Sequence, residues 1–328
     1  MIGSAASGHS RLLLSRLRNF KKLILNLIDT PVVVLCYHRV TVMPSDPHLL
    51  AVSPGNFRSH MKYLKQNFQV VRFEDDWSRL RRPAFAVTFD DGYADNAHEA
   101  LPVLEALEIP AAFFISTGNI GATEEFWWDE LERLVTGKSN YPVKFELEDP
   151  MHGRSWPTAT VEERNAMHRD IHRLTMKINA KQRTGWLKQL REWAGQDWAV
   201  EAANRSLTED ELKSLAQNQW VTIGAHTVTH SRLSALSEEE QRYEIISSKQ
   251  RLEKLLEREL NVFSYPFGKR NDYDMTSVRI CREAGFLKAA AAFPGEAHRW
   301  TDPYQIPRHF VYNWDLDTFA ARLKCLWI

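Results

Sequence analysis

Cysteine, net charge and long apolar runs are all scarce in this sequence. Among its 328 residues are three cysteines, Cys36, Cys281 and Cys325, and no CxxC pair. This odd number and wide spacing argue against a disulfide framework and fit a reducing compartment. Lys plus Arg and Asp plus Glu number 42 each, so the formal net charge is zero. We therefore expect no nucleic acid partner.

No apolar run approaches the roughly 18 residues that a membrane span requires. The first 30 residues instead combine five basic residues with apolar residues at helical spacing, which predicts a basic amphipathic helix over 1–30. This helix either docks on the domain or makes a peripheral contact with an anionic membrane. No small-residue cleavage site follows its short apolar stretch, so we expect a cytoplasmic protein, or one held at the inner face of the membrane.

From residue 31 to 328, buried-strand patterns alternate with helix patterns, which predicts an α/β fold. The expected strands cover 31–38, 84–89, 110–116, 220–226, 261–268 and 287–293. The expected helices cover 53–67, 96–108, 237–259 and 277–286. Ser237 and Glu240 form a capping-box pattern at the start of the third helix. The stretch from about 123 to 205 is polar and mostly helical, and it predicts an insertion into the domain with Trp186, Trp193 and Trp198 as local core.

Polar residues collect where three of these strands end. Asp90 and Asp91 follow the strand 84–89, His226 and His230 follow the strand 220–226, and "YPFG" ends the strand 261–268. Active sites of α/β barrels are built at the carboxyl ends of the strands. Two histidines and one carboxylate leave an open position on a bound metal, which would also relieve the repulsion between the adjacent aspartates. The alternative is a solvated turn at Asp91 and two unrelated histidines.

Two of these segments resemble the motifs of a known family. "TFDDGYADN" (88–96) and "HTVTH" (226–230) are similar to the first two motifs of the polysaccharide deacetylases, the NodB-homology domains of carbohydrate esterase family 4. "CYHRV" (36–40) resembles the branch in which a Tyr-His pair ends the first strand. The resemblance runs from about residue 32 to 293 and is interrupted by the insertion. It implies a distorted (β/α)7 barrel whose mostly helical insertion separates the two metal-binding motifs.

The resemblance also implies a reaction and its cofactor. The reaction would be metal-dependent removal of an acetyl group from an N-acetylated sugar of a glycan or glycan precursor. Asp90 would be the general base, and Asp91, His226 and His230 would be the metal ligands. Zinc is the first choice for this ligand set, and cobalt, nickel or iron also fits it. The backbone N–H of Phe267 would help to hold the oxyanion.

The remaining expectations are less closely tied to the motifs. The arginine that normally precedes the family's Pro-Tyr pair is missing before Pro266, so we expect Arg308, or otherwise Arg270, to orient Asp90. The general acid remains open between three histidines: His309, His298 and His38. The residues expected to contact the substrate, against ordinary packing as the alternative, are His38, Tyr265, Pro266, Trp127 and Trp128.

Two other functions are compatible with the same residues. One is a deformylase, or a deacetylase of a nucleotide- or lipid-linked sugar in surface polysaccharide synthesis. The other is a sugar-binding protein without catalytic activity, which the missing arginine and the unassigned acid would explain.

Overall fold

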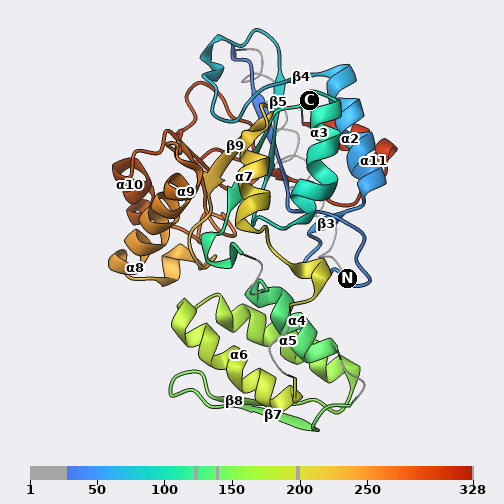
Figure 1. The fold of residues 1–328 in the computed structure, drawn as a ribbon, viewed down its shortest axis with the longest axis vertical. Coiled ribbons are helices and arrows are strands. Elements are labelled where there is room, and N and C mark those ends of the chain that lie inside the picture. Colours follow the sequence, from blue (N-terminus) through green and yellow to red (C-terminus); the bar gives the residue numbers. More distant parts are fainter. Residues whose placement is uncertain (1–27, 122–124, 138–139, 197–199, 327–328) are drawn as a thin grey trace, which may run out of the picture.

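A curled parallel sheet forms the centre of the molecule (Figure 1). The computed structural model describes residues 28–121, 125–137, 140–196 and 200–326, so the predicted N-terminal helix lies almost entirely outside the described residues. Seven strands follow the order β11–β10–β9–β6–β5–β1–β12, and β4 pairs beside β5. The strands are β1 (Val32–Tyr37), β4 (Gln69–Val70), β5 (Ala84–Phe89), β6 (Ala111–Ile115), β9 (Val221–Ala225), β10 (Val262–Ser264), β11 (Lys288–Ala290) and β12 (His309–Phe310).

Helices cover the outside of this sheet, so the predicted distorted (β/α) barrel is confirmed. They are α2 (Pro54–Asn67), η2 (Asn96–Ala100), α3 (Leu101–Ala106), α7 (Glu209–Gln217), α8 (Glu238–Arg242), η6 (Tyr243–Ser247), α9 (Ser248–Leu256), α10 (Met275–Glu283) and α11 (Leu316–Cys325). Short 3₁₀ helices are η1 (Trp77–Arg79), η3 (Thr117–Asn119), η4 (Ala202–Asn204) and η5 (Leu233–Ala235). Two short strands, β2 (Arg39–Val40) and β3 (Ala51–Val52), pair with each other. Ser237 and Glu240 form the predicted capping box.

The strand register brings the site-bearing segments to one edge of the sheet. β1 and β5 are buried along their whole length because helices pack outside and side chains fill the barrel inside. Tyr37 pairs with Phe89 at the end of these two strands, and Ile115 pairs with Ala225 at the end of β6 and β9. Because β6 pairs with both β5 and β9, the residues that follow Phe89 and Ala225 emerge at the same edge of the sheet, with β6 between them.

The chain between η3 and η4 forms a separate layer with its own apolar core, which lies below the barrel in Figure 1. It contains α4 (Trp127–Thr136), α5 (Val161–Thr175) and α6 (Ala180–Ala194). It also contains an antiparallel hairpin of β7 (Lys144–Leu147) and β8 (Arg154–Pro157) that the sequence reading missed. Trp186 and Trp193 pack in this core, whereas Trp198 lies outside the described residues. None of the helices in the described residues is long and apolar enough to span a bilayer.

Candidate active site

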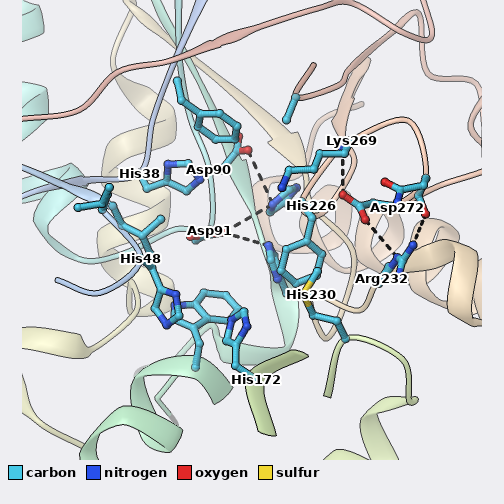
Figure 2. Close-up of a pocket in the computed structure, with 18 of the residues that line it drawn as sticks. His38, His48, Asp90, Asp91, His172, His226, His230, Arg232, Lys269 and Asp272 are labelled. Carbon is cyan, nitrogen blue, oxygen red and sulfur yellow. Dashed lines mark hydrogen bonds and ion pairs between the residues drawn. The ribbon is translucent and has the colours of Figure 1, made fainter. Parts of the chain in front are cut away.

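Asp91, His226 and His230 converge at the carboxyl edge of the sheet (Figure 2). The Oδ1 atom of Asp91 lies 3.6 Å from Nε2 of His226 and 3.3 Å from Nε2 of His230. Four ligands at the usual zinc bond lengths of about 2.0–2.2 Å would place neighbouring donor atoms at about this separation. All three side chains are buried. The structure thus brings the three predicted metal ligands together.

The chemistry of these atoms fits a divalent cation. His226 donates from Nδ1 to the carbonyl of Ser264 at 2.7 Å, which leaves the lone pair of Nε2 facing Asp91. Burial lowers the pKa of His230 to about 3, although the negative charge of Asp91 acts to raise that pKa, so the imidazole of His230 is neutral. Within the described residues, the buried Oδ1 of Asp91 has no hydrogen-bond partner. A buried carboxylate oxygen without a donor is costly, and a cation between the three groups would satisfy it.

Asp90 forms a bidentate ion pair with Arg308. The two terminal nitrogens of Arg308 lie 2.7 Å from Oδ1 and 2.7 Å from Oδ2 of Asp90, and Ser264 donates to Oδ2 at 3.3 Å. Burial alone would raise the pKa of Asp90, but the charges of Arg308 and His226 outweigh burial and hold that pKa below its ordinary value. Arg308 therefore takes the position expected of the missing arginine. Arg270 instead covers the ring of Phe293 at 3.9 Å.

Only one of the three candidate acids reaches this site. His38 lines the cavity, and its imidazole lies within 4.8 Å of ligand atoms of Cys36 and Asp90. Phe310 lines the cavity. Because successive side chains of a strand point to opposite faces, the neighbouring His309 points away from the cavity. Its Nε2 lies 3.8 Å from Oε1 of Glu296. His298 stacks on Trp300 beside the start of β1, at the opposite end of the strands.

Of the residues expected to contact the substrate, His38 and Trp128 line the cavity, and so does Phe267, which was expected to supply a backbone N–H. The rings of Phe267 and Trp128 contact His230 edge-on, with centroids 4.8 Å and 4.6 Å away. Tyr265 does not reach the cavity, because it is fully buried and stacks on Tyr273 in the barrel core. Pro266 does not line the cavity either, and Trp127 packs beside His172 in the insertion, where its centroid lies 5.0 Å from the imidazole.

The cavity has a volume of about 600 Å³, within the range of small-molecule sites. Several of the residues that line it were not predicted from the sequence. The wall on the insertion side contains His48, Leu49, Leu50, His172 and Met176; the wall on the barrel side contains Arg232, Lys269, Asn271 and Asp272. Burial lowers the pKa of His48, and it lowers the pKa of His172 to about 3. Both imidazoles are therefore neutral and can both donate and accept hydrogen bonds, as a hydroxyl-rich ligand requires.

The backbone is strained at several of these positions. Asp91, Thr227, His230 and Phe267 have positive φ angles of 77°, 65°, 51° and 60°. Such conformations cost about 1–3 kcal/mol each in non-glycine residues and persist where neighbouring contacts hold them, most often at functional sites. At Gly92, φ is 95° and a Cβ atom would lie 3.2 Å from Ile115, so the turn after the two aspartates requires glycine.

Sequence comparison agrees with this barrel and its strand-end site. The polysaccharide deacetylase family model matches residues 78–187 and 189–288, and the chain belongs to that family. The Bacillus subtilis (strain 168) protein YxkH, a polysaccharide deacetylase by name, is 21% identical over 282 residues, which cover 84% of this chain and 69% of that protein.

Two solved structures share the fold. The Streptococcus pyogenes deacetylase PplD, solved in complex with acetate, has a TM-score of 0.56 at 17% identity, covering 91% of this chain and 99% of that one. IcaB from Ammonifex degensii has a TM-score of 0.57 at 18% identity, covering 91% of this chain and 98% of that one. At these identities the likeness is one of fold.

Proposed function

We propose that this chain is a metal-dependent hydrolase that removes the acetyl group from an N-acetylated sugar of a glycan or glycan precursor. One observation carries the proposal: Asp91, His226 and His230 converge within 4.8 Å of one another beside a carboxylate, Asp90, that is held by Arg308. Membership of the polysaccharide deacetylase family supports it, and so does the acetate bound to the structurally similar PplD.

Asp91, His226 and His230 would hold the cation, zinc by preference and cobalt, nickel or iron otherwise. When bound, the cation would polarise the acetyl carbonyl and make water more acidic. Asp90 would accept the proton of the attacking water, because its carboxylate lies beside the metal position: Oδ2 of Asp90 is 3.9 Å from Nε2 of His226. Oδ2 also accepts from Ser264, but Oδ1 keeps a lone pair beyond the one that Arg308 occupies, so the ion pair orients Asp90 without blocking it.

The backbone N–H of Phe267 would stabilise the oxyanion. In the described part of the chain this N–H donates to no backbone carbonyl, and Phe267 lines the cavity with its ring against His230. A preorganised N–H of this kind contributes most where water is excluded.

His38 would protonate the departing amine, since it alone of the three candidate histidines lines the cavity. We expect His38→Gln to lower kcat for an acetamide substrate by about 10²-fold, the lower range for a general acid, with bound metal unchanged. An aryl acetate, whose leaving group needs no proton, should lose much less activity. Equal losses on both substrates would contradict this role. Stopped assays of the amide and ester with the same enzyme preparation provide the comparison.

The proposed function is tested by measuring acetate release from N-acetylglucosamine oligomers, with formylated and nucleotide-linked sugars assayed in parallel by mass spectrometry. We expect acetate from the oligomers and little reaction of the formylated analogues. A sugar carried on a diphosphate is the second candidate, because the exposed Lys269 on the cavity wall could bind a phosphate group. The other cationic side chain of that wall, Arg232, forms an ion pair with Asp272 at 3.1 Å. Glycan binding without turnover of any substrate would instead favour a non-catalytic sugar-binding protein.

A further inference from the structure

The loop from His226 to His230 carries two of the three proposed metal ligands, and two of its residues have positive φ angles: 65° at Thr227 and 51° at His230. A strained loop keeps its conformation only if other groups over-determine it. Within the loop itself, the N–H of His230 donates to the Thr227 hydroxyl at 3.1 Å. Besides the hydrogen bond from Nδ1 of His226 to the carbonyl of Ser264, three separate segments of the chain contact this loop.

The first segment is residues 116–118, which follow β6. The Ser116 hydroxyl donates to the carbonyl of His226 at 3.0 Å. The N–H groups of Thr117 and Gly118 donate to the carbonyls of Thr227 and Val228 at 3.0 Å and 2.6 Å. This segment therefore satisfies the carbonyl groups of the first three loop residues but none of the loop's N–H donors.

The second contact is the carboxylate of Glu244. Its Oε2 accepts from the N–H groups of Val228 and Thr229 at 2.8 Å and 2.9 Å, and its Oε1 accepts from the Thr229 hydroxyl at 2.5 Å. Glu244 is buried and lies on η6, a π-helical turn between α8 and α9. Such turns occur often at functional sites, and here one carries the carboxylate that caps the loop.

The third contact comes from the helical insertion. Arg183 on α6 donates to the carbonyl of Thr229 at 2.7 Å and approaches the Ser231 hydroxyl at 3.5 Å. The side chain is buried, and its guanidinium lies 5.2 Å from the ring centroid of Trp127 on α4. A buried guanidinium is costly to desolvate, and the hydrogen bonds to the loop offset part of that cost.

We infer that Glu244 and Arg183 are positioning residues that together clamp the His226–His230 loop, one through its N–H groups and one through a carbonyl, so that metal affinity depends on the helical insertion. Glu244 holds the two N–H groups at the centre of the loop, and Arg183 holds the carbonyl of Thr229, directly before His230. The insertion is thus a structural part of the metal site as well as a wall of the cavity. This inference rests on the proposed function in so far as the loop binds a metal.

The test is the dissociation constant of Zn²⁺ for the full chain, measured by competition with a chromogenic chelator, with the melting temperature as a separate readout. The variants are Glu244→Gln, which keeps the shape but removes the charge, and Arg183→Met, which keeps the aliphatic length. Arg183→Lys is the conservative variant that can still donate to Thr229. Arg191→Met is the matched control, because Arg191 also lies on α6 but pairs with Glu130 inside the insertion at 2.6 Å.

We expect Glu244→Gln and Arg183→Met each to weaken Zn²⁺ binding by about 10-fold, at the lower end of the range for groups that orient metal ligands. Arg183→Lys should recover part of this loss, and Arg191→Met should bind Zn²⁺ like the wild type even if it melts earlier. Unchanged Zn²⁺ affinity in the folded Glu244→Gln and Arg183→Met variants would overturn the clamp alone. A wild type that binds no Zn²⁺ would overturn the proposed function and the clamp with it. If Glu244→Gln does not fold, Arg183→Met decides the matter.

Discussion

Asp90→Asn is expected to lower kcat for acetate release by about 10²–10⁴-fold, the contribution of a general base, while the bound metal stays stoichiometric. Asparagine keeps the shape of the side chain and one oxygen toward Arg308, but its amide cannot accept a proton from water. Asp90 is not among the three side chains that converge on the metal position, so its change should leave their geometry intact. The measurements are single-turnover kinetics and metal analysis of the same sample.

The matched control is Asp95→Asn. Asp95 is also a largely buried carboxylate in an ion pair, with Arg39 at 3.0 Å, and it does not line the cavity. Loss of a buried partner can destabilise a protein, so both variants should melt earlier than the wild type. Only Asp90→Asn should lose catalysis in the folded protein. Wild-type turnover by Asp90→Asn would refute its role as the base.

The convergence of Asp91, His226 and His230 could be predicted because their motifs are short and follow strongly patterned strands. β5 occupies the predicted residues 84–89, and once a parallel strand is placed, the residues after it must lie at the carboxyl edge of the sheet. The same reasoning placed His226 and His230. Arg308 was a weaker prediction, because it directly precedes β12, a strand of only two residues that the sequence did not predict.

Side-chain direction is what sequence reasoning could not supply. His309 was a candidate because it lies late in the chain near a strand end, but alternation along β12 turns Phe310 toward the cavity instead. Tyr265 was expected at the substrate because it begins "YPFG", yet its ring belongs to the barrel core. The helix predicted over 237–259 was recognised as one element, whereas periodicity gave no sign of the π-helical turn that carries Glu244.

The insertion was recognised as a separate segment, but its contribution to the site was missed. Contacts such as that between Arg183 and Thr229 join residues 46 positions apart, and no local sequence pattern indicates them. The β7–β8 hairpin was missed because its strands have four residues each and include charged side chains, too little for a strand signal.

Removal of the metal is expected to abolish activity and to lower the melting temperature of the wild type. A ligand that binds only the folded state stabilises it by about 2.7 kcal/mol at 100 times its dissociation constant. For a chain of this size, that corresponds to a rise of roughly 4 °C when Zn²⁺ is restored to the chelated protein. Scanning calorimetry and the acetate assay on one chelated and reloaded sample measure both effects.

The Asp91→Asn variant separates the loss of a metal ligand from damage to the fold. Asparagine tolerates the positive φ of 77° at this position better than alanine would, so the backbone turn is preserved. Without metal, the variant should melt near or above the chelated wild type, because it removes a buried carboxylate oxygen that has no hydrogen-bond partner in the described residues. Adding Zn²⁺ should then raise the melting temperature of the wild type and of Asp90→Asn, but not that of Asp91→Asn. If Zn²⁺ stabilises Asp91→Asn as much as the wild type, the cation binds elsewhere and the convergence of Asp91, His226 and His230 is not its site.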